Sequence, residues 1–101
     1  MTARAPWRLP VKVSCSSEAD AWGRLEALTP SRARLSCQAE PHRYETLALS
    51  FELHGERFED VEARVDYCSR DEDGFWTADV DFLDPLTRRR VAQVLADVLS
   101  R

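Results

Sequence analysis

The strongest constraint on the fold is a regular alternation of apolar and polar residues that occupies the first four-fifths of the chain. An apolar residue at every second position is typical of a β-strand that buries one face. The alternation predicts six strands, at residues 11–15, 22–28, 33–37, 47–53, 61–68 and 76–82. In the fifth of these segments, the alternation places Tyr67 on the same face as Val65.

The spacing of the apolar residues changes after the sixth segment. Asp84 followed by Pro85 is typical of a helix start, because the carboxylate can accept from a free N–H and proline fits the first helical position. Apolar residues then recur at helical spacing to the end of the chain, and they are Leu86, Val91, Val94, Leu95, Val98 and Leu99. This stripe predicts a C-terminal helix over 84–100 with one buried face.

Six short strands with short connections would leave exposed edges in a flat sheet, and closure into a barrel removes those edges. We therefore predict an all-β fold with one C-terminal helix, built as a six-stranded antiparallel β-barrel. The helix stripe should cover an open end or a flank of the barrel. A chain of 101 residues is the size of one domain, so we expect a single domain over 1–101, with an N-terminal arm over 1–8, the barrel over 9–82 and then the helix.

Composition excludes several classes of protein. A formal net charge of −4 argues against a protein that binds the phosphate backbone of DNA or RNA, or that stacks single-stranded nucleic acid in a basic groove. No apolar run resembles a signal peptide or a membrane span, so we expect a cytoplasmic protein without membrane insertion. Cys15, Cys37 and Cys68 are odd in number and widely spaced, which predicts reduced thiols and neither a disulfide framework nor a zinc site.

The sequence carries no signature of an enzyme. Its three glycines are isolated, so no phosphate-binding loop is present, and no serine lies in a Gly-x-Ser-x-Gly turn. His42 and His54 fall in loops, where exposure is the expected state. We predict that the chain is not an enzyme and has no catalytic residues and no cofactor.

Two charged clusters have more than one interpretation. Asp79 and Asp81 share a strand face, but no third acidic residue is spaced to complete a metal site, so we expect a solvated face and no metal. The arginines at 88–90 lie in the first turn of the helix, where the helix dipole disfavours positive charge. Either they have an acidic or anionic partner, or they are helix-forming residues whose stems cover apolar surface.

The order of these elements resembles one known family. Arg4-Ala5-Pro6-Trp7-Arg8 runs into the first strand, a strand–turn–strand ends in Ala33-Arg34-Leu35, and the sixth strand ends in an acidic segment before an arginine-rich helix. Together these features resemble the PilZ domain family over nearly the whole chain, from Arg4 to Leu99. The resemblance implies a bacterial six-stranded β-barrel with a C-terminal helix, which serves as a receptor for cyclic di-GMP.

The family binds its nucleotide with two motifs. The resemblance implies that Arg4 and Arg8 wrap the ligand, and that a motif Asp/Asn-x-Ser-x-x-Gly between the second and third strands completes the site. In this chain that frame holds Ala27, Thr29 and Arg32. Ala27 offers no acceptor for a guanine edge, which costs about 1–3 kcal/mol. Arg32 adds a long side chain, and strain as well if its φ is positive.

The resemblance with a degenerate second motif implies a regulatory adaptor that docks onto another signalling or motility protein, with direct nucleotide binding weakened or lost. The candidate contact features are the outward-facing aromatic Trp22 or Trp7, the helix arginines and the acidic face of the last strand. The alternative is a true cyclic di-GMP receptor, which requires Arg4, Arg8 and Arg32 to converge on one surface with Thr29. In either case the ligand-binding candidates are Arg4, Arg8, Thr29 and Arg32.

Overall fold

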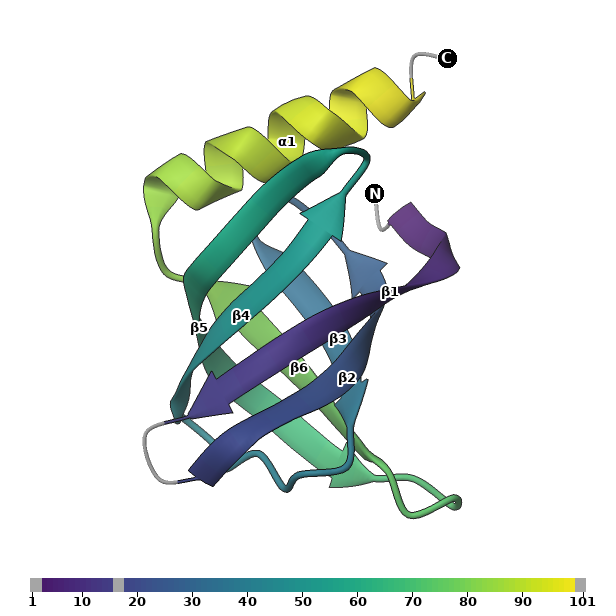
Figure 1. Ribbon diagram of the computed structural model, residues 1–101, viewed down its shortest axis with the longest axis vertical. Coiled ribbons are helices and arrows are strands. Elements are labelled where there is room, and N and C mark those ends of the chain that lie inside the picture. Colours follow the sequence, from purple (N-terminus) through teal and green to yellow (C-terminus); the bar gives the residue numbers. More distant parts are fainter. Residues whose placement is uncertain (1–2, 16–17, 100–101) are drawn as a thin grey trace.

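The computed structural model describes the backbone of residues 3–15 and 18–99, and the side chains of residues 9–14 and 20–98. Its strands form a closed barrel in the order β1-β2-β3-β6-β5-β4, and every neighbouring pair is antiparallel (Figure 1). The prediction of a six-stranded antiparallel barrel followed by one helix is confirmed. The elements are β1 (Ala3–Cys15), β2 (Glu18–Leu28), β3 (Arg32–Cys37), β4 (Thr46–Leu53), β5 (Glu56–Arg70), β6 (Trp76–Phe82) and α1 (Pro85–Leu99).

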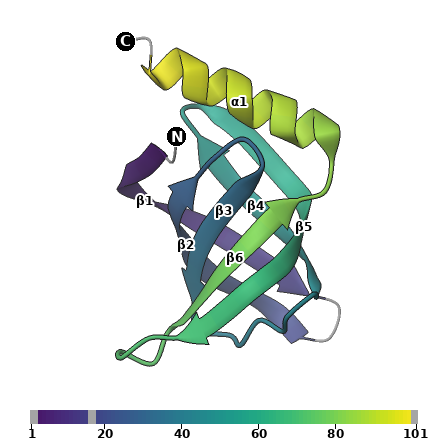
Figure 2. The ribbon, with the colours of Figure 1, turned by 180° about the vertical axis from the view of Figure 1, so that it is seen from behind.

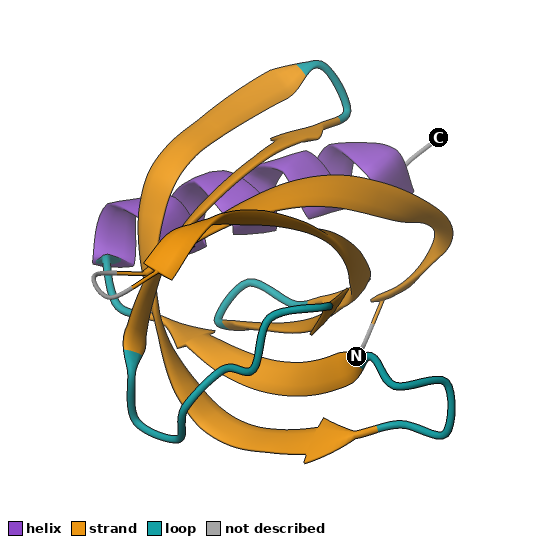
Figure 3. Cartoon of the chain, turned by 60° about the horizontal axis from the view of Figure 1, so that its bottom comes forward, coloured by secondary structure: helices purple, strands orange, loops and turns teal. Residues whose placement is uncertain are grey.

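The barrel interior is filled by the apolar members of the alternation. Figure 3 shows the barrel from the end opposite the helix. β4 follows the pattern without interruption and buries Leu47, Leu49, Phe51 and Leu53. β3 and β6 contribute the buried residues Ala33, Leu35, Cys37, Ala78, Val80 and Phe82. The predicted inward faces of these three strands are therefore confirmed.

β-bulges interrupt the alternation of buried and exposed side chains in β2 and β5. The register of β5 against β6 shifts between Val65 and Tyr67, so one extra residue lies on the bulged strand. The bulge moves Tyr67 to the outer surface, where 56% of it is exposed, and the prediction that it shares the face of Val65 is wrong. Cys68 packs against the core instead. A similar shift between Leu25 and Ala27 in β2 buries Leu28.

The helix lies across one end of the barrel, opposite the β5–β6 loop (Figures 1 and 2). Asp84 caps it as predicted, because its Oδ1 accepts a hydrogen bond from the N–H of Leu86 at 3.1 Å. Val91, Val94 and Leu95 are buried in the common core. Leu86 is 59% exposed, contrary to the predicted stripe. Leu86 precedes Val91 by five residues, which places it about 140° around the helix from the buried face.

Two of the three helix arginines bind the barrel. Arg90 Nη2 lies 2.9 Å from Glu56 Oε1, and its guanidinium lies 4.3 Å from the ring centroid of Phe58. Arg88 donates from Nε to the carbonyl of Phe82 at 2.7 Å. Both residues therefore attach α1 to the barrel, which favours the structural interpretation for them, while Arg89 is exposed.

The structure describes the side chains of two of the three cysteines. Cys37 and Cys68 are both free, and burial raises the pKa of the Cys37 thiol. The Cys37 thiol donates to the carbonyl of Ala39 at 3.1 Å. The side chain of Cys15 lies outside the described residues.

Replacing Leu95 by alanine should lower the free energy of unfolding by about 2–5 kcal/mol, because the change leaves a cavity between α1 and the barrel. Leu95 is buried in the core cluster. Urea denaturation of the variant and the wild type measures the difference. An unchanged denaturation midpoint would show that α1 does not pack on the barrel in solution.

Candidate functional site

A surface hollow of about 320 Å³ lies at the turn between β2 and β3. It contains Ala27, Thr29 and Arg32, the three positions at which the sequence resemblance places the second nucleotide motif. Its lining residues are Ala27, Leu28, Thr29, Arg32, Ala33, Arg34 and Asp79. The fold therefore places Thr29 and Arg32, two of the predicted ligand-binding residues, at one site.

Thr29 closes the turn through its side chain and its backbone. Its N–H donates to the carbonyl of Arg32 at 2.8 Å, and its hydroxyl donates to the same carbonyl at 3.2 Å. The hydroxyl also accepts from the N–H of Arg32 at 2.9 Å. Because the hydroxyl serves the turn in this way, its first role is to shape the β2–β3 connection.

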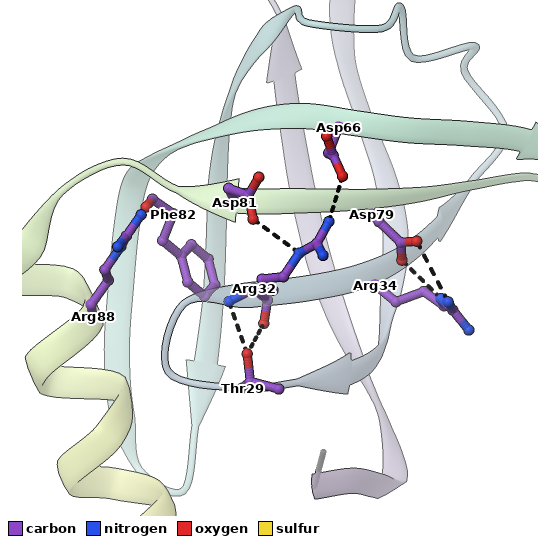
Figure 4. A network of polar contacts seen from close by, with 8 residues as sticks. All are labelled: Thr29, Arg32, Arg34, Asp66, Asp79, Asp81, Phe82 and Arg88. Atoms are coloured by element: carbon purple, nitrogen blue, oxygen red, sulfur yellow. Dashed lines mark hydrogen bonds and ion pairs between the residues drawn. The ribbon is translucent and has the colours of Figure 1, made fainter. Parts of the chain in front are cut away.

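Arg32 extends from β3 over the outer face of β6 toward β5, as Figure 4 shows. Its Nη2 lies 2.7 Å from Asp66 Oδ2 and its Nε lies 2.9 Å from Asp81 Oδ1. Arg32 is absent from the described non-glycine residues with positive φ, which are Tyr44, His54 and Asp60. The backbone strain considered for an arginine in the glycine position is therefore absent, and Arg32 acts through its charge and its bulk.

Arg34 forms a second ion pair on the same face. Its Nε donates to Asp79 Oδ1 at 2.9 Å, and its Nη2 lies 3.5 Å from Asp79 Oδ2. The hydrogen bond and charge of Asp79 raise the pKa of Arg34. The face expected to be merely solvated thus holds two arginines bound by three carboxylates, those of Asp66, Asp79 and Asp81.

Exposed ion pairs of this kind stabilise a fold by at most about 1 kcal/mol each. Their larger effect is on local charge, since the carboxylates outnumber the guanidiniums that they bind. Within the described part of the chain, no group of three or more His, Cys, Asp or Glu side chains is arranged to hold a metal ion. The described side chains of this face offer charges and hydrogen bonds for recognition.

The N-terminal arm runs beside the same turn as the first part of β1. The backbone of Ala3 pairs with Leu28 and that of Arg4 pairs with Ala27, before a register shift leads to the pairing of Leu9 with Leu25. Figure 2 shows this part of β1 next to the β2–β3 hairpin. The side chains of Arg4 and Arg8 lie outside the described residues, so the structure does not test the convergence with Arg32 that the receptor alternative requires.

Other predicted residues lie away from the hollow. Trp22 is 68% exposed on the outer face of β2, and the side chain of Trp7 lies outside the described residues. His42 and His54 are exposed, as their loop positions indicated. The described residues include no helix with the length and hydropathy that crossing a bilayer requires.

Sequence reasoning missed Asp66 and Arg34 as members of the site. A signal for Arg34 was available, because arginines two apart in β3 match aspartates two apart in β6, and opposite charges on paired strands attract. Asp66 gave no such signal. It contacts Arg32 across β6, next to a bulge that the apolar–polar pattern of the sequence does not predict.

The six-stranded barrel and the helix across its end form a PilZ-like fold. The chain superposes on the structure of the Bacillus subtilis inhibitor of motility, MotI/DgrA, with a TM-score of 0.71 and 12% identity. This match covers 99% of the chain but only 50% of the other protein. The PilZ domain of CeSA from a cellulose-synthesizing bacterium superposes with a TM-score of 0.64 and 19% identity, over 100% of the chain and 99% of that domain. No protein-family model and no curated protein sequence matches the chain.

Proposed function

We propose that this chain is a non-catalytic regulatory adaptor of cyclic di-GMP-related signalling in a bacterial cytoplasm. It acts by binding another signalling or motility protein, and its own affinity for the nucleotide is weakened or lost. The observation that carries the proposal is the state of Arg32, which stands in the glycine position of the nucleotide motif with its guanidinium bound to Asp66 and Asp81. The fold shared with a protein named as an inhibitor of motility supports the motility connection.

The charge at the hollow argues against a tightly bound cyclic dinucleotide. Such a ligand carries two phosphates, and each needs cationic hydrogen-bond donors. Arg32 and Arg34 already donate hydrogen bonds to carboxylates. A phosphate would have to displace these carboxylates from the arginines and would be repelled by their negative charge. Ala27 in addition provides no acceptor for a guanine edge, which costs about 1–3 kcal/mol for a buried donor left unpaired.

The alternative function is a cyclic di-GMP receptor that uses Arg4 and Arg8 with an atypical second motif. One observation favours it, namely that the backbone of Arg4 pairs with Ala27 at the edge of the hollow. In that case Thr29 and Arg32 would line the site, and the Arg32 guanidinium would leave Asp66 and Asp81 and bind a phosphate of the ligand.

Isothermal titration of the wild-type protein with cyclic di-GMP separates the two functions. We expect no saturable heat at ligand concentrations that would fill a micromolar site, and no shift of the melting temperature, because only a ligand that binds the native state raises it. Saturable binding that the substitution Arg8→Ala abolishes, without loss of stability, would contradict the adaptor function and establish the receptor.

A further inference from the structure

Trp22 stands between two hollows on a face of the barrel distinct from the nucleotide site. More than two-thirds of it is exposed, on the outer side of β2. The first hollow, of about 650 Å³, is lined by Trp22 and by residues that include Lys12, Ser50, Glu52, Arg57 and Asp60. The second, of about 470 Å³, is lined by Trp22 and by residues that include Arg24, Glu26, Asp71, Asp73 and Phe75.

The first hollow follows one row of residues across the sheet. Trp22 in β2 pairs with Lys12 in β1, and Lys12 pairs in turn with Ser50 in β4. The Ser50 hydroxyl accepts from the N–H of Asp60 at 3.0 Å, which holds that residue of β5 at φ 50°. The indole and an acidic residue therefore mark the two ends of a single shallow groove.

Carboxylates dominate the rims of both hollows. In the first, Lys12 lies 3.8 Å from Asp20 and Arg57 lies 3.5 Å from Glu59, so both cations already have acidic partners. Glu52 and Asp60 form no ion pair with any described residue.

In the second hollow, Asp71 and Asp73 of the β5–β6 loop likewise form no ion pair with any described residue. Asp71 instead accepts from the N–H groups of Asp73 and Phe75 at 2.9 Å each, which fixes the loop. Arg24 is a basic lining residue there, and it stands among Glu26, Asp71 and Asp73. Trp22 is thus an exposed apolar side chain with acidic residues in the hollows on both sides of it.

We propose that Trp22 and its two flanking hollows form a docking surface for a basic segment of a partner protein. An apolar side chain of that segment packs on the indole, and lysine or arginine side chains on either side bind Glu52, Asp60, Asp71 and Asp73. Exposed tryptophans are frequent interface anchors, and cations pack well on an indole face. The excess of carboxylates over cations around Trp22 selects a cationic partner and repels nucleic acid and anionic lipid. The proposal rests on the adaptor function, since it names the surface through which the adaptor binds.

Random peptides displayed on phage test the proposal on the intact wild-type protein. Soluble Trp22→Ala protein is added in excess, so that clones bound elsewhere are removed. We expect the enriched peptides to carry net positive charge around an apolar residue. Synthetic copies should bind wild type with an affinity that falls as salt rises, and should lose about tenfold or more on Trp22→Ala and on Glu52→Lys combined with Asp60→Lys.

Tyr67→Ala is the matched control, because it removes a comparably exposed aromatic from β5 and should leave peptide affinity unchanged. Unshifted melting temperatures of the variants show that they fold. Failure to enrich, acidic or neutral peptides, or equal binding to Trp22→Ala would each overturn the docking surface. A wild-type dimer that Trp22→Ala converts to a monomer would overturn it as well, since the occupant would then be a second copy of the chain. Saturable cyclic di-GMP binding overturns the adaptor function instead, whatever the peptide result.

Discussion

Replacing Phe58 by alanine should lower the free energy of unfolding by about 3–5 kcal/mol, which is a large part of the stability of a domain of this size. Phe58 is fully buried in β5. Its ring stacks on that of Phe51 with 4.9 Å between centroids, and the guanidinium of Arg90 from α1 lies 4.3 Å from its centroid. The substitution thus removes core volume and loosens α1 at the same time. Urea denaturation, with the slope checked for constancy, measures the loss.

A matched control separates this effect from that of removing any large apolar side chain. Leu86→Ala removes a leucine from the exposed side of α1 and should change stability by less than about 0.5 kcal/mol. Phe58→Leu should fall between the wild type and Phe58→Ala, because it leaves a smaller cavity. A loss below about 1 kcal/mol for Phe58→Ala would contradict the packing of β5 against the helix.

The fold was predictable because each strand carries its own local signal. The alternation in β4 needs no knowledge of its neighbours, and Leu47, Leu49, Phe51 and Leu53 all point inward as the pattern indicates. The N-cap at Asp84 is equally local. These features depend on residues a few positions apart, which is the range over which sequence patterns carry information.

The candidate site was only partly predictable because its contacts depend on strand order and on bulges. Arg32 meets Asp66 across an intervening strand, at a distance of 34 residues along the chain. The bulge that turns Tyr67 outward leaves the sequence alternation intact, so the pattern alone assigns the wrong face. The prediction for Leu86 was wrong for a different reason. A helical stripe predicts a buried face only for residues whose angles about the helix axis are close together, and Leu86 lies outside that range.

The role of Arg32 in the structure therefore differs from the one that its sequence position suggests. From the motif alone, Arg32 is expected to replace a glycine and to obstruct a ligand. In the fold it has an ordinary strand conformation and forms ion pairs with two aspartates. The substitution Arg32→Gly would restore the motif residue but would remove both ion pairs beside the hollow. The electrostatic effect on an anionic ligand therefore opposes the steric one.

Ala27→Asn combined with Asp66→Asn should raise the affinity for cyclic di-GMP by about two to three powers of ten over the wild type. The asparagine introduced in β2 supplies an acceptor for a guanine edge, worth about 1–3 kcal/mol. The change at position 66 replaces the carboxylate 2.7 Å from Arg32 Nη2 by a neutral amide, a weaker acceptor that a phosphate can displace. A hydrogen bond from this nitrogen to the charged phosphate is worth about 1.5–3 kcal/mol. At about 1.4 kcal/mol per power of ten, the two gains together reach the stated range. Titration calorimetry of each single variant and of the double variant measures them.

Arg32→Gly is the informative control for this prediction. If charge controls the site, Arg32→Gly should bind cyclic di-GMP no better than the wild type, because Asp66 and Asp81 then face the ligand without the ion pairs to Arg32. If bulk controls it, Arg32→Gly alone should gain affinity and the double variant should not. The second result would contradict our account of the site, and it would mean that the ion pairs of Arg32 only position a side chain whose size excludes the nucleotide.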